Sequence, residues 1–201
     1  DHQRVGRDAA IVLERVVRTR LGQDGLCLAD LPMAQRLNEL SFDLATRHVD
    51  IGALNRLLEQ AAGDALSPLA PIAVETFQGM LTGVIDLVLE HHGRYYVVDY
   101  KSNFLGGSIE HNRPDALRAA VSERRYDLQY LLYTLALHRF LGVRLPDYRY
   151  QQHVGGVYYL FLRGMRPGLG PDYGVYFDRP AELVIETLDR QIFAWSEESA
   201  A

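Results

Sequence analysis

Two apolar arms decide the fold of this chain: Gly83-Val84-Ile85-Asp86-Leu87-Val88-Leu89 and Tyr95-Tyr96-Val97-Val98-Asp99-Tyr100-Lys101, joined by His91-His92-Gly93-Arg94. Their β-branched and aromatic residues predict two antiparallel strands within a β-like segment, residues 75–100. With His92 and Gly93 as the two turn residues, Asp86 and Asp99 lie directly opposite one another. Residues opposed in this way have Cβ atoms about 4.5–5.5 Å apart.

Two opposed carboxylates between apolar runs are unfavourable unless something binds them. Like charges that face each other destabilise a sheet, and burial makes each carboxylate harder to ionise. A hard cation removes both problems, because carboxylate oxygens are the ligands that magnesium takes. Lys101 lies two residues beyond Asp99 on the same face, where its ammonium group can position a water or offset charge on a phosphate. The competing interpretation is that Asp86 is a strand-end acid and that Asp99 and Lys101 form a surface ion pair.

A second polar pair lies four residues apart on a segment that reads as a helix. Gln129 and Tyr133 share one helical face at this spacing. Alone, the pair is explained well enough as the polar side of an amphipathic helix. Beside the hairpin, it is a candidate to hold a phosphate or to support Lys101.

The remaining pattern predicts an α/β domain, a mixed sheet flanked by helices, in the order α-β-α-β-β-α-β-β-α. Asp50 is suited to cap a helix that ends at Gly63, and Pro180 suits the first turn of the last helix. The expected helices are 8–21, 50–63, 114–141 in two pieces that meet near Arg125, and 180–196. The other expected strands are 40–45, 157–162 and 175–177, and the loops are 67–71, 102–115 and the stretch around 166–168. We expect one domain over residues 1–201.

The composition is that of an ordinary globular chain of 201 residues, 48% hydrophobic and 23% charged. No stretch reaches the roughly 20 apolar residues of a membrane span, no signal peptide opens the chain, and its start resembles a cut inside a longer protein. The single cysteine, Cys27, fits a reducing cytoplasm, where we expect the protein to act. The net charge of −5 argues mildly against nucleic-acid binding, although carboxylates gathered around a cation would also produce it.

Taken together, the motifs resemble the RecB nuclease family, a branch of the PD-(D/E)xK nucleases with a restriction-endonuclease-like core. The resemblance runs from about Asn38 to Arg163. It rests on the segments Gly83-Val84-Ile85-Asp86, Tyr95-Tyr96-Val97-Val98-Asp99-Tyr100-Lys101-Ser102-Asn103, Gln129-Tyr130-Leu131-Leu132-Tyr133 and Gly155-Gly156-Val157-Tyr158-Tyr159-Leu160-Phe161-Leu162-Arg163-Gly164.

The resemblance implies a role for each of these positions. Asp86 and Asp99 would be metal ligands and Lys101 the catalytic lysine, with Gln129 and Tyr133 as the helix motif that supports the site. Glu39 matches the upstream acid of the family, which helps to hold the metal or its water; without the resemblance, a solvent-facing strand acid would be the preferred interpretation. The expected cofactor is Mg²⁺, one or two ions per site, with Mn²⁺ or Ca²⁺ able to replace it in binding.

The resemblance also implies partners. Single-stranded DNA would be fed by a helicase portion of the same full-length protein, alongside subunits of the RecC and RecD kind, with RecA as a further candidate and no membrane. The chain carries no Gly-x-x-x-x-Gly-Lys-Ser/Thr phosphate loop, so ATP hydrolysis would reside elsewhere. The family's metal-binding histidine would lie upstream of Asp1, which predicts weaker metal binding by this segment alone.

Two other functions compete with a DNA nuclease acting in double-strand-break repair and recombination. One is a nuclease-fold scaffold that binds DNA or partner subunits without cutting, although a scaffold has no reason to oppose two carboxylates in a sheet. The other is a metal hydrolase of small phosphoesters, which would need a closed pocket. Four tyrosines at strand spacing could stack on bases, but core packing is the preferred interpretation: Tyr95, Tyr96, Tyr158 and Tyr159.

Overall fold

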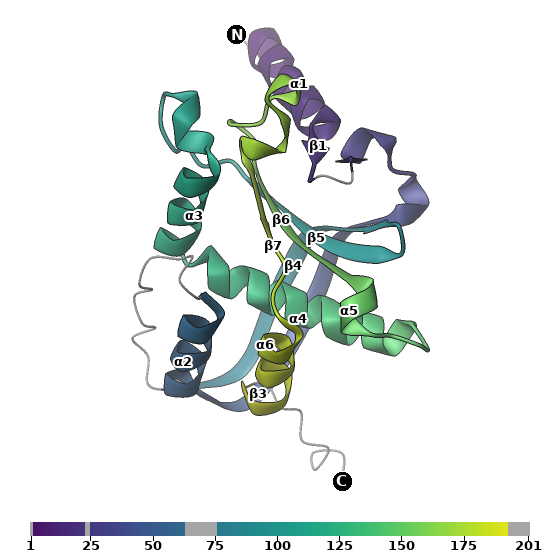
Figure 1. Ribbon diagram of the computed structural model, residues 1–201, viewed down its shortest axis with the longest axis vertical. Helices are drawn as coiled ribbons and strands as arrows, with labels where there is room; N and C mark the ends of the chain where they lie inside the picture. Colours follow the sequence, from purple (N-terminus) through teal and green to yellow (C-terminus); the bar gives the residue numbers. More distant parts are fainter. Residues whose placement is uncertain (1, 23–24, 63–75, 193–201) are drawn as a thin grey trace.

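A mixed five-stranded sheet forms the centre of the molecule, as the sequence predicts (Figure 1). The computed structural model describes residues 2–22, 25–62 and 76–192. The strand order is β3-β4-β5-β6-β7, in which only β5 and β6 run parallel to each other. The strands are β3 (Arg36–Asp50), β4 (Thr76–His91), β5 (Arg94–Lys101), β6 (Val154–Phe161) and β7 (Val175–Asp178).

The hairpin of β4 and β5 has the predicted register. His91 pairs with Arg94 and Leu87 pairs with Val98, which makes His92 and Gly93 the two turn residues. Both have a positive φ, 52° and 76° respectively, as a type I′ turn requires. The x-Gly pattern therefore gave the correct turn and, through it, the correct pairing along both strands.

Helices cover both faces of this sheet. They are α1 (His2–Arg18), α2 (Ile51–Ala62), α3 (Pro114–Glu123), α4 (Tyr126–Arg144), the short α5 (Tyr150–His153) and α6 (Glu182–Thr187), which continues as a π-helical turn, η6 (Leu188–Ile192). On one face, α2, α3, α4 and α6 pack on residues such as Val97 and Val157. On the other face, α1 and a two-stranded sheet, β1 (Arg20–Leu21) with β2 (Leu26–Cys27), pack near Val98 and Leu160. The middle of β5 and the whole of β6 are thus buried between these two layers.

Local signals placed two of the helix ends correctly. The Asp50 carboxylate accepts a hydrogen bond from the Ala53 amide (3.0 Å), so it caps α2. The predicted break near Arg125 is confirmed, because α3 ends at Glu123 and Arg125 takes the left-handed φ of 54° before α4 begins.

Other expectations need correction. The first helix ends at Arg18, and Leu21 belongs to β1, where its side chain is fully buried. The last helix begins at Glu182, after Pro180. Short 3₁₀ turns occupy parts of the two predicted loops: η4 (Ile109–Asn112) and η5 (Pro167–Asp172). Two more, η1 (Leu28–Asp30) and η2 (Met33–Gln35), precede β3. The predicted loop at 67–71 lies outside the described residues.

No helix within the described ranges has the length and apolar character needed to cross a membrane.

Candidate active site

The hairpin brings Asp86 and Asp99 together where its backbone ladder ends. The last ladder pair is Leu87 with Val98, and the next position along the same register is Asp86 opposite Asp99. Here a side chain replaces the ladder, because the Asp86 Oδ2 accepts a hydrogen bond from the Tyr100 amide (2.9 Å). The side-chain bond fixes the Asp86 carboxylate against the end of β5.

Lys101 lies beside Asp99 and is almost completely buried. Its Nζ is 2.7 Å from the Asp99 Oδ2, and only 7% of the lysine is exposed. The ammonium also lies over two aromatic rings, 3.9 Å from the centroid of Tyr126 and 4.5 Å from that of Tyr159. A cation on ring faces in a desolvated site is stabilised by more than the exposed equivalent. The surface ion pair considered from the sequence is therefore a buried one.

Helix α4 supplies the groups that hold the lysine. Lys101 Nζ donates to the Gln129 Oε1 (2.6 Å), and the Gln129 Nε2 donates to the Tyr133 hydroxyl (2.9 Å). The Tyr159 hydroxyl donates to the same Gln129 oxygen (3.1 Å). The spacing of four residues thus lets Gln129 contact both Lys101 and Tyr133. Of the two roles open for this pair, the geometry matches support of Lys101.

Asp99 is the acid of the group whose ionisation is made harder by its surroundings. Burial raises the pKa of the Asp99 carboxyl, the hydrogen bond and charge of Lys101 oppose the rise, and the Asp86 charge adds to it. The charges of both acids act on Tyr133. Burial raises the pKa of its hydroxyl most, and the charges of Asp99 and Asp86 raise it further. Two acids and one ammonium leave one negative charge in excess, which favours binding of a further cation.

Glu39 is near the pair by register but is not gathered with it. It lies on β3 between Asn38, which pairs with Leu87, and Leu40, which pairs with Ile85, and so stands opposite Asp86. Its φ of 55° is left-handed, and its side chain is exposed. Within residues 2–22, 25–62 and 76–192, no group of three or more His, Cys, Asp or Glu side chains lies close enough to hold a metal. Its role as a ligand stays a prediction.

The residues present fit a hard divalent cation in their chemistry. Asp86 and Asp99 offer carboxylate oxygens, and none of the ion pairs among the described residues includes Asp86. Carboxylate oxygens are the donors that magnesium and similar ions prefer. The excess negative charge of the site acts in the same direction.

Two aromatic members of the site were not assigned to it from the sequence. Tyr126 precedes Gln129 by three residues, so helical spacing offered a signal for it. Tyr159 lies opposite Asp99 in the parallel pairing of β5 with β6. No turn connects these two strands, so no local pattern fixes that register.

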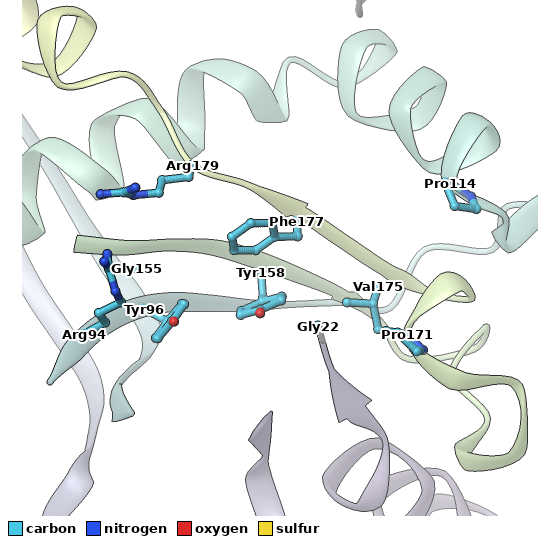
Figure 2. Close-up of a pocket in the computed structure, with 10 residues that line it drawn as sticks. All are labelled: Gly22, Arg94, Tyr96, Pro114, Gly155, Tyr158, Pro171, Val175, Phe177 and Arg179. Atoms are coloured by element: carbon cyan, nitrogen blue, oxygen red, sulfur yellow. The ribbon is translucent and has the colours of Figure 1, made fainter. Parts of the chain in front are cut away.

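The preferred interpretation of the strand tyrosines as core residues agrees with their burial. A hollow of about 740 Å³ lies on the sheet face opposite α4. Figure 2 shows the rings of Tyr96, Tyr158 and Phe177 along it, between Arg179 and Pro171. Tyr96 is 6% exposed and Tyr158 5%, and their ring centroids are 5.7 Å apart. Rings buried to this extent offer no free face to a base.

Comparisons with known proteins agree with this geometry. A family model described as the PD-(D/E)XK nuclease superfamily matches residues 4–198. The RecBCD enzyme subunit RecB of Haemophilus influenzae is 45% identical over 179 residues, which cover 88% of this chain and 14% of that protein. The same subunit of Escherichia coli K12 is 41% identical over 187 residues, 92% of this chain and 16% of that protein. That of Mycobacterium tuberculosis H37Rv is 37% identical over 215 residues, 94% of this chain and 20% of that protein. The chain thus corresponds to 14–20% of the length of these relatives.

Proposed function

The chain belongs to the PD-(D/E)XK nuclease superfamily, and on this basis we propose that it is a magnesium-dependent deoxyribonuclease of the RecB type that hydrolyses phosphodiester bonds. The observation that carries the proposal is the group formed by the buried Asp99 and Lys101 with the half-buried Asp86, in which Gln129 fixes the lysine. A scaffold would gain nothing from burying an acid and an ammonium beside a second acid, because taking charged groups out of water costs free energy.

The identity of residue 101 supports a chemical role. Lys101 is the only lysine in the chain, whereas arginine occurs 20 times. Arginine stands at all the remaining positions that carry a permanent positive charge, and lysine stands only at this one. The ammonium is a compact point charge with freely rotating donors, whereas a guanidinium is a planar fork that would not fit between Asp99 and Gln129 in the same way.

Each residue has a definite task in this proposal. Asp86 and Asp99 would hold the magnesium ion, with Glu39 as the third acid, and the ion would supply a Lewis acid that lowers the pKa of a bound water. Lys101 donates a hydrogen bond that orients the attacking water or neutralises charge on the phosphate oxygen. Gln129 positions Lys101, and Tyr133 positions Gln129.

The wider role follows from the relatives. The RecB subunits that the chain resembles are named as parts of a RecBCD enzyme. We extend this to the chain: it cuts single-stranded DNA delivered by a helicase portion of the same protein, in a complex with RecC- and RecD-like subunits and in functional contact with RecA, during double-strand-break repair and recombination. Delivery by an attached motor explains how a chain with a net charge of −5 manages with little DNA affinity of its own.

The test is degradation of labelled single-stranded DNA by the full 201-residue chain, in magnesium and in EDTA. The unchanged chain is expected to cut only with magnesium. Lys101→Ala and Lys101→Arg are both expected to lose activity by about 100-fold or more, because neither retains the ammonium. Arg124→Ala, at an exposed arginine after α3, is the matched control and retains full activity. No degradation by the unchanged chain in magnesium contradicts the proposal, and so does degradation by the Lys101 variants at the rate of the unchanged chain.

A further inference from the structure

A second hollow, of about 650 Å³, adjoins the candidate active site at the end of β5. It is formed by the loop 104–109, which follows Lys101, by the segment after β6 and by one side of α1. The lining side chains that matter here are Arg15, Phe104, Ile109, Arg163, Arg166 and Leu169.

The hollow carries a concentrated positive charge. Three arginines line it, and its lining contains no Asp or Glu. None of the three takes part in the ion pairs found among the described residues. The hydrogen bonds found for Arg163 and Arg166 go to backbone carbonyls: Arg163 Nε donates to the Ser102 oxygen (3.0 Å), and Arg166 Nη1 donates to the Met165 oxygen (2.8 Å) and the Arg163 oxygen. Carbonyls orient a guanidinium without neutralising it, so these charges suit an anionic ligand. In a chain with a net charge of −5, this local excess is not explained by composition.

The same hollow exposes apolar side chains. Phe104 is 66% exposed, Leu169 43% and Ile109 36%. An exposed phenylalanine adds nothing to the core, and its free ring face is of the kind on which nucleic-acid bases stack. Ring faces beside arginines are the combination that single-stranded nucleic acids use, with phosphates on the cations and bases on the rings.

The hollow is fixed to the candidate active site by short connections. Phe104 lies three residues after Lys101 in the chain. The Leu162 amide donates to the Lys101 carbonyl (3.0 Å), so the segment that carries Arg163 begins against the end of β5. The Tyr126 hydroxyl donates to the Asn103 Oδ1 (3.0 Å), which ties the loop to α4. The hollow therefore begins at the end of β5, the strand that carries Asp99 and Lys101.

We infer that this hollow is a binding site for single-stranded polynucleotide, which holds the nucleotides next to the phosphodiester that is cut. The three arginines contact successive phosphates, and Phe104 stacks on one unpaired base without regard to its identity. The inference rests on the proposed nuclease function for its purpose, but the binding itself does not require cleavage.

The test measures binding in EDTA, where cleavage does not interfere. The probe is a fluorescent oligodeoxythymidine of about 15 nucleotides, titrated with the full 201-residue chain at several salt concentrations. Arg163→Ala and Arg166→Ala are each expected to weaken binding and to reduce the salt slope by about 0.7. Phe104→Ala is expected to weaken binding by about tenfold with the slope unchanged. Arg15→Ala provides a fourth variant that removes no hydrogen bond found in the structure.

Two controls match these changes. Arg124→Ala removes an exposed arginine elsewhere, and Phe177→Ala removes a phenylalanine that is 48% exposed on β7; both are expected to bind like the unchanged chain. A blunt duplex of the same length is expected to bind more weakly, since paired bases cannot stack on Phe104.

The outcomes separate this inference from the proposed function. Binding that is absent in the unchanged chain, equal in all variants, or lowered as much by the controls overturns the inference, even where the chain cuts DNA. Binding lost only in the hollow variants supports it, even where no cleavage occurs.

Discussion

Replacing Gln129 by methionine isolates the group that holds the lysine. Gln129 accepts from Lys101 Nζ and the Tyr159 hydroxyl and donates to the Tyr133 hydroxyl. Methionine keeps a similar volume and an unbranched shape but removes all three hydrogen bonds. The Tyr159 hydroxyl still donates to the Tyr126 carbonyl (2.9 Å), so the loss of its bond to Gln129 costs the least of the three.

The expected cost follows from those bonds. A hydrogen bond to a charged group contributes about 1.5–3 kcal/mol and a neutral one about 1 kcal/mol. Losing the bond to Lys101 and the bond to Tyr133 therefore lowers the free energy of unfolding by about 2.5–4 kcal/mol. The lysine, still paired with Asp99, gains freedom at its other side, and a displacement of about 1 Å costs about 100-fold in rate. We expect kcat to fall by that factor with KM little changed, because Gln129 contacts Lys101 and acts on the substrate only through it.

The assay has three readouts: urea unfolding, steady-state DNA cleavage and the accessibility of the single lysine. Lys101 is only 7% exposed, so an amine-reactive reagent should label it slowly, and an adduct at this position is unambiguous by mass spectrometry of the peptides. Gln129→Met is expected to label faster. Gln129→Glu, which still offers an oxygen to Lys101, is expected to lose less activity, and Gln152→Met, at an exposed glutamine of α5, none. Unchanged kcat and labelling in Gln129→Met, or equal losses in the Met and Glu variants, refute the positioning role.

Three further expectations follow from the fold. Gly83→Ala is expected to lower stability by about 1–3 kcal/mol in urea unfolding, because its new Cβ would overlap the ring of Phe42; a stability equal to that of the unchanged chain would mean that the ring yields freely. Asp50→Ala is expected to cost about 1 kcal/mol, since the amide of Ala53 loses its cap, whereas Asp50→Asn should retain it. Burial lowers the pKa of His138 below its ordinary value of 6.5, so protonation favours the unfolded chain and stability falls as the pH drops through and below that value. The urea midpoint of the unchanged chain should therefore fall more between about pH 7.5 and about pH 5.5 than that of His138→Gln, and parallel profiles would contradict this.

The parts of the fold that could be predicted are those controlled by local chemistry. The turn at His92 and Gly93 sets a register over a few residues, and that register brought Asp86 opposite Asp99. Helix caps and breaks are local in the same sense, as at Asp50 and Arg125. The fold class then followed from the order of the elements.

The parts that escaped prediction depend on contacts between distant segments. Leu21 continues a helical period, yet it pairs in β1 with Leu26, a strand partner that no periodicity reveals. Tyr159 reaches Gln129 only because β6 pairs in parallel with β5 after a long crossover. Glu39 could be assigned only by resemblance, and its left-handed φ and exposed side chain had no sequence signal.

The two-residue turn of the hairpin has a consequence for how this chain can change during evolution. The turn lies about 20 Å from Asp86 along β4, at about 3.4 Å per residue. An added residue that a longer turn takes up leaves the pairing of Asp86 with Asp99 unchanged, because three- to five-residue hairpin loops also join paired strands. An added residue in the ladder between the turn and either acid instead slips the strands and turns one acid to the opposite face. A lineage that keeps Asp86 and Asp99 working together must therefore keep the number of residues between each acid and the turn, and it can vary the turn itself within what a positive φ and a longer loop allow.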